Sequence, residues 1–223
     1  MLRKFIKYLA SFSPVSLTKN DYYDRLTEKV IKKVCISDSV CVDIGANEGK
    51  ILKLFIIHCP KAMHFAFEPI DKLYYLLVRK YGSAARIFNI ALSYRKGFSA
   101  FTHVLTDSAY SSLRVREFSD QMLSNLLEVE IDCLDNLIPS TTDVSLIKLD
   151  IEGGEYDALA GAEKTIKRCK PYILFEFGKG GADAFGVTPV RMFNFFSALG
   201  YGVNLLNRFL KNENGFMLNS FIK

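Results

Sequence analysis

The sequence predicts an α/β fold, in which a mostly parallel sheet carries helices on both faces and a C-terminal hairpin adds an antiparallel strand. Three observations support this prediction. Short apolar β-type runs alternate with helical segments along the chain, and glycine or acidic residues follow directly where several of these runs end. The chain has 223 residues, of which 49% are hydrophobic and 24% charged, which is enough for one full core. No internal repeat and no linker divides it.

The individual elements follow from hydrophobic spacing and from turn residues. An amphipathic helix is expected near the start, because apolar and basic residues alternate at helical spacing before Pro14. Strands are predicted at residues 40–44, 64–68, 86–91, 98–104, 127–131, 144–150 and 171–177. Helices are predicted at residues 2–9, 21–34, 50–58, 72–81, 154–168 and 188–200, and a hairpin at 201–206 and 216–222. The polar stretch 106–125 has no assignable pattern.

The net charge of +5 is concentrated at the start of the chain. Residues 1–33 hold eight basic and three acidic side chains, so the remainder is neutral. A nucleic-acid enzyme usually carries basic charge on its body, so no nucleic-acid partner is expected. We expect residues 1–35 to be a helical extension and 36–223 the main domain. Residues 1–13 are predicted to make a weak contact with an anionic membrane surface, and the alternative is packing on the domain itself.

The five cysteines are odd in number, widely spaced and free of any C-x-x-C pair. This distribution is typical of buried, reduced thiols, so neither a disulfide framework nor a metal site is predicted. No signal peptide is predicted, because the basic, apolar start lacks a clean hydrophobic region and a cleavage site. The protein is therefore expected to be cytoplasmic, with peripheral contact at the inner membrane face as an option. The oligomeric state does not follow from the sequence.

In open α/β sheets, ligands bind beyond the carboxyl ends of the strands. The first strand delivers Asp43 and a loop with glycines at 45 and 49, a spacing that fits neither a dinucleotide nor a P-loop fingerprint. Asp43 places negative charge where those folds bring phosphate. Glu68 ends the next strand, 19 residues after Gly49, where a carboxylate can accept hydrogen bonds from both ribose hydroxyls. A nucleoside with a cationic end and no phosphate is S-adenosylmethionine.

These motifs make the chain similar to the FkbM-type methyltransferases. The matching segments are VDIGANEG at 42–49, FEP at 67–69, NIALS at 89–93, the pair Ser111–Ser112, IKLDIEGGEYDALAGA at 147–162 and ILFEF at 173–177. The resemblance covers roughly residues 38–206 and implies a Rossmann-like class I methyltransferase sheet of about seven strands. It also implies methyl transfer from S-adenosylmethionine to oxygen, often a hydroxyl of a sugar, glycan or small metabolite. The alternatives are a methyltransferase acting on protein or nucleic acid, and a non-catalytic cofactor-binding module.

The resemblance assigns roles position by position. It implies that the cofactor loop and ribose site use Asp43, Gly45, Ala46, Asn47, Gly49, Glu68 and Pro69, with Asn89 and Ala91 beside the adenine. Asp150 and Glu152 face the reacting methyl, with Asp150 the first candidate for the base and Glu152 the second. Candidate substrate contacts are His103, Ser111, Ser112, Glu155 and Glu176. For two carboxylates a purely structural role remains open, because Asp43 can cap the following helix and Glu155 can favour a helix dipole.

Overall fold

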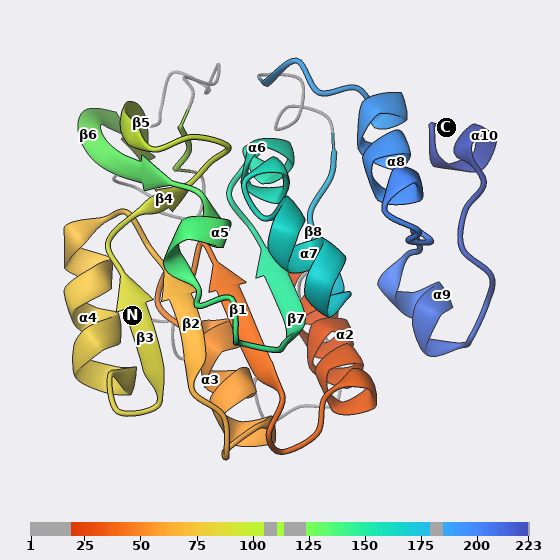
Figure 1. The fold of residues 1–223 in the computed structure, drawn as a ribbon, viewed down its shortest axis with the longest axis horizontal. Coiled ribbons are helices and arrows are strands. Elements are labelled where there is room, and N and C mark those ends of the chain that lie inside the picture. Colours follow the sequence, from red (N-terminus) through yellow and green to blue (C-terminus); the bar gives the residue numbers. More distant parts are fainter. Residues whose placement is uncertain (1–18, 105–110, 114–123, 179–184, 223) are drawn as a thin grey trace.

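The computed structural model describes residues 19–104, 111–113, 124–178 and 185–222 (Figure 1). The helix predicted at residues 2–9 lies outside these residues, as does most of the polar stretch 106–125. No helix in the described part combines the length and the apolar character that crossing a bilayer requires.

The central sheet has five parallel strands and confirms the predicted class. They are β1 (Val40–Ile44), β2 (His64–Phe67), β3 (Ala85–Phe88), β7 (Val144–Leu149) and β8 (Tyr172–Phe175), in the order β3-β2-β1-β7-β8. The register pairs Ile44 with Phe67 on one side and with Leu149 on the other. Three strands therefore end level with one another, and the residues that follow them meet at one edge.

A second sheet stands apart from the first, so the described strands form five plus three instead of one sheet of seven. Its strands are β4 (Ala91–Leu92), β5 (Gly97–Val104) and β6 (Ser124–Asp132), in the order β4-β6-β5. β6 runs parallel to β4 and antiparallel to β5. The prediction did not include the short helix α5 (Leu134–Leu137) that follows β6.

Helices cover both faces of the central sheet (Figure 1). On one face α2 (Lys19–Val34), α3 (Lys50–His58) and α4 (Asp71–Tyr81) pack on side chains such as Cys41 and Leu146. On the other face α5, α6 (Glu155–Ala160), α7 (Glu163–Cys169) and α8 (Pro189–Ala198) pack on Val42, Ile44 and Ile147. Because strand side chains alternate between faces, Asp43, which lies two residues after Cys41, belongs to the face that α2 and α3 cover.

The helix predicted over residues 154–168 is divided into α6 and α7 at Gly161. A side chain at Gly161 would place its Cβ 2.0 Å from the carbonyl oxygen of Ser93, so only glycine fits. The start of α7 is then capped by Asp135 of α5, whose carboxylate accepts hydrogen bonds from the N–H groups of Lys164 and Thr165, both at 2.8 Å. This cap comes from a distant part of the chain, so no local pattern reveals it.

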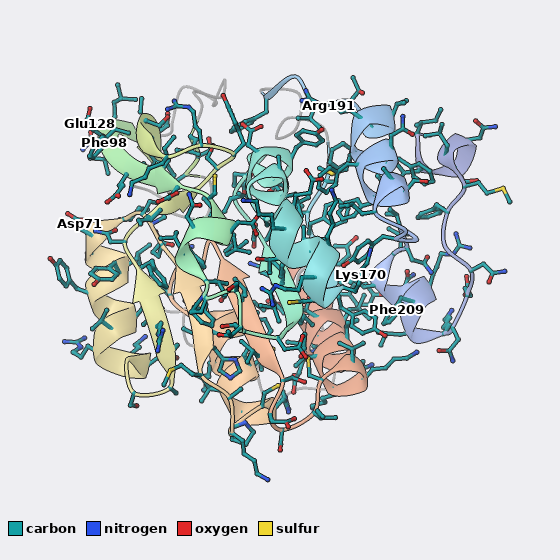
Figure 2. The ribbon with its side chains drawn as sticks, in the orientation of Figure 1. Asp71, Phe98, Glu128, Lys170, Arg191 and Phe209 are labelled. Atoms are coloured by element: carbon teal, nitrogen blue, oxygen red, sulfur yellow. The ribbon has the colours of Figure 1, made fainter. Side chains whose placement is uncertain are left out.

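The predicted C-terminal hairpin strand is wrong. The tail does turn back, and Phe216 N–H donates to Val203 O at 2.7 Å, but it forms the helices α9 (Leu206–Leu210) and α10 (Leu218–Phe221) instead of a strand pair. The Lys33 ammonium of α2 donates to Phe209 O at the end of α9 and lies 5.0 Å from the Phe209 ring centre. Phe209 (Figure 2) also packs edge-on against Tyr172 of β8, with ring centres 5.8 Å apart. These tertiary contacts favour a helix at this position.

Helix α2 is part of the core in this structure. Its Val30 and Ile31 are almost fully buried, and Ile31 packs with Cys41 of β1 and Phe55 of α3. The boundary predicted at residue 35 stays a prediction, although α2 packs as tightly as the helices that follow it.

Candidate functional site

A cavity of about 460 Å³ lies beyond the carboxyl ends of β1, β2 and β7, bordered by the second sheet and by α2. Its volume is within the range of ~300–1,000 Å³ that is typical of small-molecule sites. Nine of the residues that the sequence singled out line it: Asp43, Gly45, Ala46, Asn47, Glu68, Pro69, Ala91, Ser111 and Asp150. Segments far apart in the sequence therefore converge as predicted.

The loop after β1 adopts the left-handed conformations that its glycines allow. The φ angles of Gly45 and Gly49 are 78° and 81°, and Asn47 between them has 48°. A Cβ at Gly45 would lie 2.2 Å from the carbonyl oxygen of Asp150. The missing side chain at Gly45 thus lets this loop touch the end of β7, which joins the two most diagnostic motifs of the sequence.

Glu68 holds the glycine loop against the end of β2. Its Oε2 accepts a hydrogen bond from Asn47 N–H at 2.8 Å, and its Oε1 accepts one from Ile70 N–H at 2.9 Å. The side chain is 4% exposed, and burial raises the pKa of Glu68 to about 7 against the pull of these two bonds. Each carboxylate oxygen can accept a second bond, so the ribose role remains available.

Asp43 is fully buried beneath the cavity, and neither carboxylate oxygen has a hydrogen-bond partner among the described residues. Burial raises the pKa of Asp43 to about 6. The positive charge of Lys148 and the nearby Leu52 N–H, which falls short of hydrogen-bond geometry, lower this pKa, and the negative charge of Asp150 adds to the rise. Asp43 pairs in register with Lys148 on the adjacent strand β7. An unsatisfied buried carboxylate is costly, so Asp43 is suited to a polar or cationic ligand.

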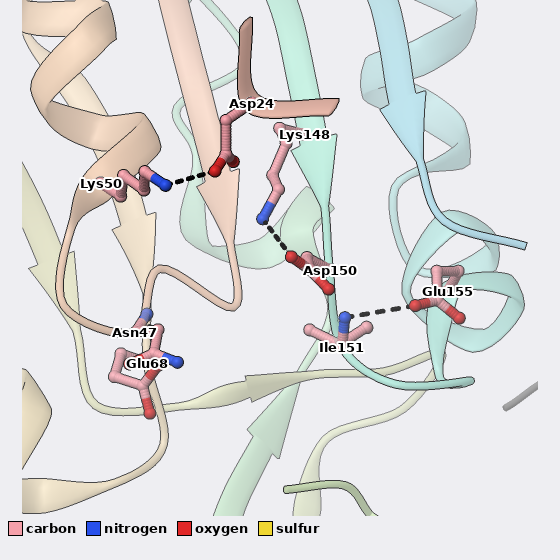
Figure 3. A network of polar contacts seen from close by, with 8 residues as sticks. All are labelled: Asp24, Asn47, Lys50, Glu68, Lys148, Asp150, Ile151 and Glu155. Atoms are coloured by element: carbon pink, nitrogen blue, oxygen red, sulfur yellow. Dashed lines mark hydrogen bonds and ion pairs between the residues drawn. The ribbon is translucent and has the colours of Figure 1, made fainter. Parts of the chain in front are cut away.

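Lys148 is a site residue that the sequence reasoning missed. Its ammonium lies 3.0 Å from Asp150 Oδ2 (Figure 3), and the charges of Asp43 and Asp150 raise the pKa of Lys148 although burial opposes them. The available signal was a lysine inside the otherwise apolar strand 144–149, two positions before an aspartate. In a strand that spacing places both side chains on one face.

Helix α2 contributes to the same cavity through Asp24, which was also missed. Asp24 forms an ion pair with Lys50 at the start of α3, and both residues line the cavity (Figure 3). Nothing in the local sequence around Asp24 marks it as a site residue. Only the packing of α2 across the sheet brings it there.

Several predicted residues lie elsewhere. Glu155 is buried and its Oε1 accepts a hydrogen bond from Ile151 N–H at 3.2 Å, so it braces the turn after β7 and does not line the cavity. Burial raises the pKa of Glu155. Glu152 is half-buried in a left-handed conformation with φ 57°, outside the cavity lining. Glu176 is exposed after β8 and does not line the cavity either.

The remaining predicted residues border the site. Asn89 donates a 2.5 Å hydrogen bond to Asp71 instead of lining the cavity, and Gly49 packs under Leu77 of α4. Ser112 is fully buried and exchanges two backbone hydrogen bonds with Thr102, which holds Ser111 at the cavity. The side chain of His103 lies outside the described part of the structure, so its predicted substrate contact stays a prediction.

The charge of the lining defines which ligands fit. The lining holds five acidic residues and two lysines: Asp24, Asp43, Glu48, Glu68 and Asp150, with Lys50 and Lys148. This excess of acid favours a ligand with a cationic group and opposes a phosphate. S-adenosylmethionine has such a cation and a ribose, so the residues present fit it. Glu68 would hold the ribose, the Gly45–Gly49 loop would lie against the nucleoside, and Asp43 would lie toward the cationic end.

Comparison with known proteins agrees with this chemistry. The profile of the methyltransferase FkbM domain matches residues 43–203. The 2-O-methyltransferase NoeI of Sinorhizobium fredii (strain NBRC 101917 / NGR234) is 27% identical over 155 residues, and the match covers 63% of each chain, so it spans less than two thirds of that relative.

Two solved structures align with the chain at low similarity. The precorrin-6y C5,15-methyltransferase of Geobacter metallireducens GS-15 aligns with a TM-score of 0.46 and 14% identity over 86% of this chain and 78% of its own. The plantazolicin methyltransferase BpumL, solved in complex with SAH, aligns with a TM-score of 0.35 and 14% identity over 77% and 48%. The family assignment rests on the domain profile and on the motifs that converge at the cavity: this chain belongs to the FkbM methyltransferase family.

Proposed function

We propose that the protein is an S-adenosylmethionine-dependent O-methyltransferase whose acceptor is a hydroxyl of a sugar, a glycan or another small metabolite. The observation that carries the proposal is the convergence of Asp43, Glu68 and Asp150 from three strand ends on one cavity. The name of the relative NoeI, a 2-O-methyltransferase, supports oxygen as the accepting atom.

The cofactor supplies an electrophilic methyl group on a sulfonium. Glu68 would accept hydrogen bonds from the ribose hydroxyls. Its carboxylate oxygens have lone pairs left for them beyond the bonds from Asn47 N–H and Ile70 N–H. Asp43, buried and without a hydrogen-bond partner in the described part, would stabilise the positive charge of the ligand. Neither Glu68 nor Asp43 would take part in the methyl transfer itself.

Asp150 is the candidate base because it is the accessible carboxylate at the end of β7. Its side chain is 46% exposed, whereas Asp43 and Glu68 are buried. Asp150 would accept the proton of the acceptor hydroxyl as the new carbon–oxygen bond forms. Lys148 holds one carboxylate oxygen at 3.0 Å, which leaves the other free to take that proton.

The proposal is tested by transfer from methyl-labelled S-adenosylmethionine into an extract of the source organism, separated into small-molecule, glycan, protein and nucleic-acid fractions. We expect label in the small-molecule or glycan fraction with the native protein and not with Asp150→Asn. Label in protein or nucleic acid would overturn the acceptor class. Binding of the cofactor without label in any fraction would favour a non-catalytic module.

A further inference from the structure

Three of the five cysteines, which the sequence spreads over 25 positions, come together in one cluster away from the cavity lining. Cys35 follows the end of α2, Cys41 lies in β1, and Cys59 follows the end of α3. Their Sγ atoms all lie within 4.8 Å of one another, and the Sγ atoms of Cys35 and Cys41 are 3.9 Å apart. Cys41 and Cys59 are fully buried, and Cys35 is half-buried.

We propose that Cys35, Cys41 and Cys59 form a binding site for one soft, thiophilic metal ion of the Zn²⁺ or Cu⁺ class. Thiolate sulfur is the ligand that these ions prefer. Two thiolates bound to the same tetrahedral zinc at ~2.3 Å have their sulfurs about 3.8 Å apart. The Sγ atoms of Cys35 and Cys41, 3.9 Å apart, match that spacing. Three ligands leave one position for water or another donor.

Backbone contacts fix the cluster in place, which distinguishes it from thiols that merely fill a core. His64 of β2 is fully buried; its Nδ1 accepts a hydrogen bond from Cys41 N–H at 3.3 Å, and its Nε2 lies 3.1 Å from Cys59 O. Since Nδ1 accepts, Nε2 carries the proton and donates it to that carbonyl. One neutral imidazole therefore joins the backbones of two of the three cysteines and holds them close together.

The other anchors are helix ends. Cys35 N–H donates to Ile31 O at 2.9 Å, and Cys59 N–H donates to Phe55 O at 2.7 Å. Each cysteine is thus held by its own backbone while its Sγ points at the other two. Metal binding would displace the thiol protons to solvent and supply the positive charge that three adjacent thiolates need.

The expected consequence is structural. An ion bound to all three sulfurs would tie the ends of α2 and α3 to β1. Helix α2 brings Asp24 to the cavity and α3 brings Lys50, so the ion would hold both helices in the arrangement that lines the cavity. It would take no part in methyl transfer, and the inference stands whether or not the proposed acceptor is right.

The test uses the full chain, reduced, freed of metal and handled without oxygen. Zn²⁺ and Cu⁺ are titrated separately against a chromophoric chelator, and thermal unfolding is followed with and without each ion. We expect one ion per chain and a higher midpoint temperature in its presence.

Cys35→Ser is the informative variant. Because Cys35 is half-buried and Cys41 is buried, a serine hydroxyl should destabilise the fold less at position 35 than at position 41. We expect Cys35→Ser to lower metal affinity by more than the ~10–100-fold that is typical of outer-shell changes and to abolish the temperature shift. Cys133→Ser is the matched control, since Cys133 is also half-buried but lies outside the cluster.

Two results would overturn the proposal. One is the absence of tight binding of either ion by the native chain while its circular dichroism shows it folded. The other is equal binding by the native chain and Cys35→Ser. A disulfide between Cys35 and Cys41 that forms readily in air, together with no metal uptake by the reduced chain, would assign the cluster to redox chemistry instead.

Discussion

Replacing Glu68 separates its role in the ligand site from its role in the fold. Its carboxylate accepts hydrogen bonds from two buried backbone N–H groups. Glu68→Ala leaves both N–H groups without a partner, which costs roughly 1–3 kcal/mol of stability each. The same substitution removes a buried charge. The pKa rise from 4.5 to about 7 corresponds to a cost of about 3 kcal/mol for the ionised form at pH 8. The two effects oppose each other, so we expect the free energy of unfolding to fall by no more than about 3 kcal/mol.

Glu68→Ala should affect cofactor binding more than it affects stability. Two charge-assisted hydrogen bonds to the ribose are worth roughly 2–4 kcal/mol, so Glu68→Ala should weaken binding of S-adenosylmethionine by at least ~30-fold. Calorimetric titration gives the dissociation constant, and urea unfolding gives the stability. Glu163→Gln, which removes an exposed carboxylate paired with Lys167 on α7, is the control and should bind normally. Equal dissociation constants for native protein and a folded Glu68→Ala would refute the assignment.

The raised pKa of Glu68 adds a pH signature. The folded chain holds this proton between pH 4.5 and about 7 while the unfolded chain does not, so Glu68 lowers the free energy of unfolding as pH rises through that window. Ribose hydroxyls favour the ionised form, so cofactor affinity should instead fall about fivefold from pH 7 to 6, as the ionised fraction of Glu68 falls. Calorimetry across this range checks the prediction, and an affinity that stays constant down to pH 6 would contradict it. Glu68→Gln should reduce the dependence to the smaller part that Asp43, with its pKa of about 6, contributes.

Three further predictions concern catalysis, loop geometry and the start of the chain. Asp150→Asn should lower kcat by about 10²–10⁴-fold and leave cofactor affinity within a few-fold; a larger loss in Glu152→Gln would move the base to that residue. Gly45→Ala should lower the free energy of unfolding in urea by at least about 2 kcal/mol more than Gly200→Ala does. Both glycines have φ near 78°, but only at Gly45 would the new Cβ meet a carbonyl oxygen, at 2.2 Å. Equal losses of stability would show that this contact relaxes. Removal of residues 1–13 should leave cofactor binding intact but reduce sedimentation with anionic vesicles, at about 1 kcal/mol per lost basic residue; a full-length protein that ignores vesicles at low salt would contradict this.

Much of the cavity was predictable because strand ends can be located in the sequence and parallel strands bring their ends to one edge of the sheet. The runs that end at Ile44, Phe67 and Leu149 are short, apolar and followed by glycine or carboxylate, and parallel pairing brings such ends to one edge. Asp43, Glu68 and Asp150 therefore needed no tertiary information to be placed together.

The residues that were missed depend on packing between distant segments. Asp24 reaches the cavity only because α2 packs across the sheet. Lys148 did carry a local signal, a lysine two positions before Asp150, but its place in the cavity depends on the pairing of β7 with β1. In the tail, Lys33, more than 170 residues earlier, donates a hydrogen bond to the carbonyl oxygen of Phe209 in α9, a contact that no local pattern reveals. Glu155 was expected at the substrate, but its carboxylate braces its own turn. Periodicity carries no information about such partners.

We propose that the cavity beyond β1, β2 and β7 holds S-adenosylmethionine with its ribose on Glu68 and its reacting end toward Asp150. The most direct test is a crystal structure of the full chain with the demethylated product of the cofactor. We predict both ribose hydroxyls within hydrogen-bond distance of the Glu68 carboxylate and the sulfur on the Asp150 side of the cavity. A product bound outside this cavity, or inside it with the ribose away from Glu68, would contradict the account.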